Sequence, residues 1–196
     1  MTELLTTPLH AWHSENGARM VPFAGWDMPV QYVGILEEHK HTRTAASIFD
    51  ISHMGEFLLE GAGATDALAR IVTHNLATLA PGKCRYGFLL NEKGGVLDDL
   101  IVYRLDTEKY MLVVNGACID SDFAWIGAHL PAGMTFVNQS FDIAKIDLQG
   151  PASFDVLSRV MPGDWAGLGY FGFRETDFEG FRLIVSRTGY TGEVGY

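Results

Sequence analysis

Two adjacent carboxylates, Asp98 and Asp99, stand in an otherwise apolar segment directly after a Gly-Gly pair. The β-branched and aromatic content of 97–104 predicts a strand, whose side chains alternate between two faces. One carboxylate therefore shares a face with Leu100 and the other with Ile101. At least one of them must lie beside a cavity, beside a cationic partner or at the solvent-exposed end of the strand. The pattern alone does not choose between them, and both could simply face solvent at the mouth of a hairpin.

Aromatic residues lie beside glycines at four places, which are 23–26, 86–88, 170–173 and 189–192. Flat rings on turns with little neighbouring bulk can form the walls of a slot for a planar heterocycle. Each motif taken singly is better explained by core packing above a tight turn. Their joint occurrence with Asp98 and Asn115 favours a ligand site.

The histidines and cysteines do not have metal-ligand spacing. His39 and His41 would lie on different faces of a helix, and neither Cys84 nor Cys118 belongs to a C-x-x-C pair, so we expect no metal site. P-loop and G-x-S-x-G motifs are missing from the sequence, and the G-x-G-x-x-G at 167–172 leads into a strand pattern, whereas a dinucleotide-binding motif opens a helix. Dinucleotide binding, P-loop phosphoryl transfer and serine-hydrolase chemistry thus lose their usual support.

The composition is that of a soluble globular protein, with 47% apolar and 19% charged residues among 196. Fourteen basic against 24 acidic side chains give a net charge of −10, which argues against a nucleic-acid partner because phosphates are bound by Lys and Arg. No apolar run approaches the roughly 18–20 residues of a membrane span, so we expect no membrane partner. The N-terminus lacks a signal-peptide pattern and the chain has two cysteines, which predicts a reduced, cytoplasmic setting.

The elements that position these residues include a strand-to-helix unit that occurs twice in the sequence. Residues 59–71 align without gaps with 148–160 at an offset of 89. Each copy has a strand pattern, a Gly at the turn and apolar positions at helical spacing. A weaker match at an offset of 85 joins 87–95 to 172–180. The repeat predicts two related α+β subdomains.

Between and around the two copies we expect a hairpin of 97–104 with 110–115 and a helix over 35–46. A second helix should follow the hairpin, capped by Asp120 or Ser121. The chain stops on an aromatic residue, so we expect it to belong to a longer protein.

Several long motifs, in the right order over essentially the whole chain, resemble the aminomethyltransferase family, the T-proteins of the glycine cleavage system. The segments that carry this resemblance are 7–10, 17–29, 49–55, 94–103 and 186–193. A T-protein has nearly twice this length. The resemblance implies a tetrahydrofolate-dependent enzyme that takes the aminomethyl group from the lipoyl arm of H-protein. Such an enzyme releases ammonia and leaves 5,10-methylenetetrahydrofolate.

The resemblance also implies the domain organisation. Residues 1–53 with 142–196 would form a discontinuous, incomplete first folate-binding subdomain, and 54–141 an inserted second one. Both would have mixed or antiparallel sheets with flanking helices. The family's C-terminal β-barrel domain, and two folate contacts expected beyond Tyr196, are absent from this chain.

By motif position, Asp98 matches the family's catalytic aspartate, which lies beside the folate. A carboxylate there could orient the pterin and stabilise positive charge as the amine leaves. Tyr170 and Phe171 stand where relatives place paired aromatics, and the sequence does not decide which ring stacks. The remaining positions matched around the folate pocket are Met54, Tyr86, Val114, Asn115 and Tyr190.

Other folate proteins are alternatives. The folate domains of sarcosine and dimethylglycine oxidases follow a flavin domain, whereas this chain opens with the T-protein motif. The Lys-Gly-Cys-Tyr-x-Gly-Gln-Glu signature of folate-binding iron–sulfur assembly factors is missing. A demethylase of dimethylsulfoniopropionate type and a non-catalytic folate-binding protein both stay open.

Overall fold

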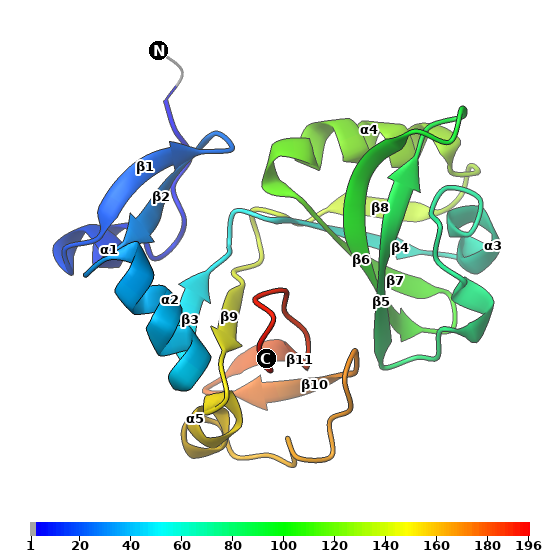
Figure 1. Ribbon diagram of the computed structural model, residues 1–196. Helices are drawn as coiled ribbons and strands as arrows, with labels where there is room; N and C mark the ends of the chain where they lie inside the picture. The colour runs from blue at the N-terminus through cyan, green and yellow to red at the C-terminus, as the bar shows by residue number, and fades with distance from the viewer. Residues whose placement is uncertain (1–2) are drawn as a thin grey trace. The chain divides into compact units, whose positions relative to one another are not determined.

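The computed structural model describes residues 3–196, which divide into two compact units (Figure 1). Unit 1 consists of Met1–His53 with Ala144–Tyr196, and unit 2 is Met54–Ile143. The chain therefore leaves unit 1, builds all of unit 2 and returns. The limits expected from the sequence place the second boundary at residue 142, and the assignment of each unit to folate binding stays a prediction.

Unit 2 is built on a five-stranded antiparallel sheet in the order β5-β6-β7-β4-β8. Its strands are β4 (Gly55–Glu60), β5 (Lys83–Leu90), β6 (Val96–Asp106), β7 (Lys109–Val114) and β8 (Thr135–Asn138). The expected hairpin is the β6–β7 pair, in which Ile101 lies opposite Val113. Leu100 and Val102 of β6 are buried, so one face of the sheet meets the core.

Helices α3 (Ala64–Leu68) and α4 (Ile119–His129) contribute apolar side chains to the core of unit 2. Two 3₁₀ turns, η1 (Leu76–Thr78) and η2 (Gly116–Cys118), complete the unit. The prediction that Asp120 or Ser121 caps α4 is wrong. The helix begins at Ile119 without a side-chain cap, because η2 leads straight into it, and the Ser121 hydroxyl donates to the Cys118 carbonyl at 2.9 Å.

The described residues of unit 1 form three two-stranded antiparallel sheets and three helices. The sheets pair β1 (Arg19–Phe23) with β2 (Trp26–Gln31), β3 (Ser47–Asp50) with β9 (Ile146–Gln149), and β10 (Phe173–Phe178) with β11 (Phe181–Ser186). The helices are α1 (His10–Glu15), α2 (Ile35–Thr44) and α5 (Ser153–Val160). No helix in the described part of the chain is long and apolar enough to cross a bilayer.

The sequence repeat corresponds to a repeat in structure. Gly61 and Gly150, at equivalent positions, both adopt positive φ angles of 145° and 127°, which favour glycine. Three residues later α3 begins at Ala64 and α5 at Ser153. Leu148 of β9 exchanges backbone hydrogen bonds of 2.7 and 2.8 Å with Tyr196, so β9 has a second antiparallel neighbour, as β4 has β7. The predicted α+β class with antiparallel sheets is confirmed.

Candidate functional site

Asp98 is the buried carboxylate of the adjacent pair. It shares the core-facing side of β6 with Leu100 and Val102, and its side chain is only 8% exposed. Asn115, directly after β7, donates to both of its oxygens. The backbone N–H reaches Oδ2 at 3.2 Å, and the side-chain amide nitrogen reaches Oδ1 at 2.9 Å. These two bonds fix the plane of the Asp98 carboxylate.

Asp99 points to the opposite face of the sheet, where it meets Tyr86 of the neighbouring strand β5. Desolvation, followed by the charges of Asp99 and Asp98, raises the pKa of Tyr86, so its phenol stays protonated at neutral pH. Tyr86 is half-exposed and packs edge-on against Phe88, with ring centroids 5.5 Å apart. Asn115 also donates to the Asp99 carboxylate at 3.2 Å. One amide thus links both carboxylates beside an accessible pair of rings.

Two residues that the sequence argument did not select, Cys118 and Asp122, lie close to Asp98. A carboxyl oxygen of each aspartate and the Cys118 sulfur all lie within 4.8 Å of one another. Desolvation, reinforced by Asp98, raises the pKa of Asp122 to about 8. Burial, together with the two aspartates, raises the pKa of Cys118 to about 11. Their spacing in the sequence could have indicated this grouping. Cys118 and Asp122 are four residues apart at the start of a helix, which places them on one helical face.

This cluster is compact enough to be considered for a metal ion. Metal ligands, however, must be deprotonated, and thiolate is the form of cysteine that binds metals. Without a metal, the raised pKa values of Cys118 and Asp122 keep both side chains protonated at neutral pH, so a metal ion would have to displace both protons in order to bind. We therefore interpret the cluster as a set of hydrogen-bond donors around one carboxylate.

The other residues matched to the folate pocket are divided between the two units. Met54 is half-buried just before β4. Val114 packs its side chain fully inside the core of unit 2, so that side chain is not accessible to a ligand. Unit 2 therefore brings together Asp98, Asn115 and Tyr86.

Unit 1 carries the remaining three aromatics. Tyr170 is 65% exposed and meets Phe171 edge-on, at 4.6 Å between centroids. Phe171 adopts a left-handed backbone with φ of 54°, a conformation that non-glycine residues seldom take. Tyr190 is 92% exposed, on the loop after β11. The exposed rings of Tyr170 and Tyr190 can contact a planar ligand, whereas Phe171 is half-buried.

The loop that carries Tyr190 is held from inside by Gln149. This side chain is fully buried, its amide nitrogen donates to the Thr188 carbonyl at 3.1 Å, and its oxygen accepts from the Thr191 hydroxyl at 2.9 Å. An exposed ring therefore sits on an anchored segment.

Unit 1 also contains a buried polar network around Asp50, whose side chain is fully buried. Asp50 accepts hydrogen bonds from the Thr7 hydroxyl at 2.6 Å and from the Ser52 N–H at 3.0 Å. It also contacts the His13 ring at 2.9 Å, and the other ring nitrogen of His13 meets the Tyr32 hydroxyl at 2.5 Å. The network ties the N-terminal segment to β3.

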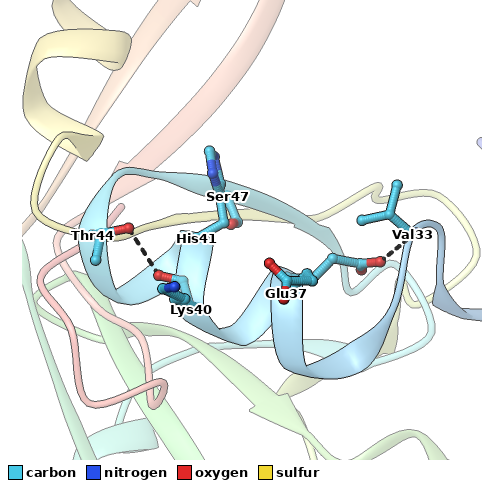
Figure 2. A pocket seen from close by; sticks show the side chains of 7 residues that line it. Val33, Glu37, Lys40, His41, Thr44 and Ser47 are labelled. Atoms are coloured by element: carbon cyan, nitrogen blue, oxygen red, sulfur yellow. Dashed lines mark hydrogen bonds between the residues drawn. The ribbon is translucent and has the colours of Figure 1, made fainter.

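A surface hollow of about 450 Å³ lies along helix α2 of unit 1 (Figure 2). Its lining consists of Val33, Glu37, Glu38, Lys40, His41, Thr44 and Ser47. Figure 2 shows the Thr44 hydroxyl bonded to the Lys40 carbonyl, at 2.9 Å. The hollow contains none of the predicted site residues, and its lining is largely one polar, exposed helix face.

Taken together, the fold and the site define an α+β protein of two related units. One unit presents an oriented buried carboxylate, and both present accessible aromatic rings. The sequence matches the model of the GCVT N-terminal domain over residues 9–196. The chain belongs to the GCVT N-terminal domain family.

Individual relatives agree with this assignment. An aminomethyltransferase from Chlorobium phaeovibrioides is 46% identical over 192 residues, which cover 96% of this chain and 53% of that protein. One from Listeria monocytogenes is 41% identical over 197 residues, which cover 100% of this chain and 54% of that protein. The chain thus spans about half the length of the curated relatives it matches.

Two solved structures show the same fold. The glycine cleavage system aminomethyltransferase T from Bartonella henselae matches with a TM-score of 0.89 and 38% identity, covering 98% of this chain and 52% of that one. A heterotetrameric sarcosine oxidase from Corynebacterium matches with a TM-score of 0.58 and 15% identity, covering 81% of this chain and 80% of that one. The second likeness is one of fold alone.

Proposed function

We propose that the protein transfers the aminomethyl group from the lipoyl arm of H-protein to tetrahydrofolate, releasing ammonia and forming 5,10-methylenetetrahydrofolate. The observation that carries this proposal is the buried carboxylate of Asp98, oriented by Asn115. The carboxylate by itself does not define the reaction. Aminomethyl transfer is proposed because the chain is similar to proteins named aminomethyltransferase.

The residues of unit 2 suit a pterin ring. The Tyr86–Phe88 ring pair offers accessible rings, and Asp99 offers a carboxylate on the same face of the sheet. The Asn115 amide bonds this carboxylate and also the buried carboxylate of Asp98. Flat apolar walls with a few placed polar groups are typical of sites for planar heterocycles. Tetrahydrofolate, when bound, supplies the nitrogen that takes up the one-carbon group.

Asp98 acts in this proposal through its charge. The amine leaves as positive charge develops on nitrogen, and a carboxylate fixed in advance stabilises that charge without having to reorganise. Asn115 keeps the carboxylate in place during this step. Met54 is a further pterin contact of unit 2 in the proposal, and Val114 supports Asn115 from the core. For unit 1 by itself, Tyr170, Phe171 and Tyr190 are proposed as folate contacts because they match the family's motif positions.

Lipoylated H-protein is the proposed partner, and neither nucleic acid nor membrane enters the proposal. The net charge of −10 supports the first exclusion, because binding phosphates calls for basic residues. A cytoplasmic setting is proposed on the two free thiols of Cys84 and Cys118, since reduced cysteines suit a reducing compartment.

Ammonia release from aminomethyl-loaded H-protein, with tetrahydrofolate present, tests the proposal in the whole protein. Asp98→Asn removes the charge at constant volume and should lower turnover by about 100-fold or more. Asp99→Asn, its neighbour on the opposite face, should cost much less. Thermal unfolding of both variants checks that they are folded.

Each alternative has its own signature in this assay. A protein that binds tetrahydrofolate but releases no ammonia would be a non-catalytic binder. Methyl transfer from dimethylsulfoniopropionate without ammonia release would indicate the demethylase. Equal turnover of the two aspartate variants would move the active carboxylate away from Asp98.

A further inference from the structure

Two carboxyl groups lie side by side in the interior of unit 2. Asp98 is 8% exposed and Asp122 is 2% exposed, and an oxygen of one lies within 4.8 Å of an oxygen of the other. Among residues 3–196, the ion pairs of the structure include neither carboxyl. Two like charges at this distance, without a cation and away from water, cannot both be held at neutral pH.

Hydrogen bonding decides which member of the pair is charged. Asn115 directs its backbone N–H and its side-chain amide to the two oxygens of Asp98, and donors stabilise the ionised form. Asp122 has no such support, and its Oδ2 is buried without a hydrogen-bond partner. Asp98 is therefore the carboxylate, and Asp122 is the carboxylic acid.

We propose that Asp122 is a positioning residue for Asp98, holding one proton and donating it to the Asp98 carboxylate so that the pair carries a single negative charge. No covalent bond is made or broken in this role. The effect of Asp122 on turnover rests on the proposed aminomethyl transfer. The sharing of one proton between Asp98 and Asp122 does not depend on that function.

The surroundings of the pair agree with one shared charge. Asp98 comes from β6, Asp122 from α4, and Cys118 from the turn η2 that leads into α4. Asp99, whose carboxylate accepts from the Asn115 amide, and the protonated phenol of Tyr86 add negative charge and a neutral donor, and neither supplies a cation. The pKa of Cys118, raised to about 11, keeps its thiol neutral beside the pair.

This arrangement predicts an alkaline limit to activity. Desolvation and the Asp98 charge raise the pKa of Asp122 to about 8. Above that pH Asp122 loses its proton, Asp98 loses a donor, and the two carboxylates repel. The whole protein should therefore lose turnover as the pH rises through about 8.

Carboxyl ¹³C NMR of the whole wild-type protein, with aspartate labelled, tests the shared proton directly. One aspartate carboxyl should titrate near pH 8, and that signal should vanish in Asp122→Asn. Titration of every aspartate below pH about 5 would overturn the inference. The wild-type measurement decides this point whether or not any variant folds.

Turnover against pH tests the positioning role. Asp122→Asn keeps a neutral donor of the same shape, so it should retain activity within a few-fold at pH 7 and lose the alkaline decline. Asp122→Leu offers no donor and should lower turnover by about 10-fold or more at pH 7. Asp120→Asn, a change at an exposed neighbour on α4, should leave the profile unchanged.

Equal losses in Asp122→Asn and Asp122→Leu, or an alkaline decline that persists in Asp122→Asn, would overturn the positioning role. A wild-type protein that shows the titration near pH 8 but no ammonia release would refute the proposed function and leave the shared proton intact.

Discussion

The side chain of Gln149 occupies the space where a β-carbon on Gly189 would lie. Gly189 has a positive φ of 145°, and the loop closes over the buried amide of Gln149 from that position. The strand β9 and the loop that presents Tyr190 are thereby fastened together inside unit 1. A binding loop fixed in this way has little freedom to lose when a ligand binds.

Replacing Gln149 with Leu should destabilise unit 1 and loosen this loop. The change leaves the buried Thr188 carbonyl without its donor, which costs about 1–3 kcal/mol of unfolding free energy. Denaturant unfolding measures the loss, and hydrogen exchange should quicken over 188–192. Gln31→Leu, at a half-exposed site, is the control, and equal stabilities of the two variants would contradict the fastening role.

Gly150→Ala should destabilise more than Gly180→Ala. Both glycines have positive φ, so an added methyl group strains both backbones, but nothing lies within 4 Å of a β-carbon on Gly180. A β-carbon on Gly150 would meet the Ala45 carbonyl and lie 2.7 Å from the Thr42 carbonyl. We expect an additional loss of about 1–3 kcal/mol for this overpacking, measured by denaturant unfolding. Matching losses would mean that backbone strain alone requires Gly150.

Asp50 should make stability fall in acid. Burial raises the pKa of Asp50, but the hydrogen bonds from Thr7, His13 and Ser52 outweigh it and lower the pKa below its usual value. A depressed pKa gives stability that is present above the unfolded-state pKa, about 3.9, and is lost as pH falls through the folded-state value.

Unfolding free energies between pH 7 and pH 2 check this dependence. Asp50→Asn should be less stable at pH 7 and should lose less stability on acidification, because the titrating group is gone. Asp177→Asn, at an exposed site on β10, should keep the wild-type slope. If the unfolding free energy of Asp50→Asn changed with pH as steeply as that of the wild type, Asp50 would not be the source of the acid-dependent loss of stability.

Asn115→Ala should impair transfer more than folding. It removes the side-chain donor to Asp98 Oδ1 but keeps the backbone N–H on Oδ2. Loss of one hydrogen bond to a charged group corresponds to about a 10- to 100-fold fall in turnover. Ammonia release measures it, and Asn16→Ala, at an exposed helix end, is the matched control. A change in Tm without a change in turnover would assign Asn115 a structural role alone.

Local patterns in the sequence predicted the elements that depend on near neighbours. The Gly61 and Gly150 turns, each followed by a helix, were readable because a turn glycine and helical spacing are properties of a few consecutive residues. The hairpin and the placement of Asp98 and Asp99 on opposite faces follow from strand alternation in the same way. The start of α4 at Ile119 was missed, because the 3₁₀ turn before it leaves no capping signal to read.

Tertiary structure alone decided which carboxylate is buried and what surrounds it. Strand alternation separates Asp98 from Asp99, but only the packing of the core against one face of β6 buries Asp98. The same packing put Val114, matched to the ligand pocket by its motif, inside the core. Asp122 approaches Asp98 because β6, β7 and α4 fold back on one another. A pattern in the chain records the spacing of neighbours, whereas the charge state of this pair depends on distances across the fold.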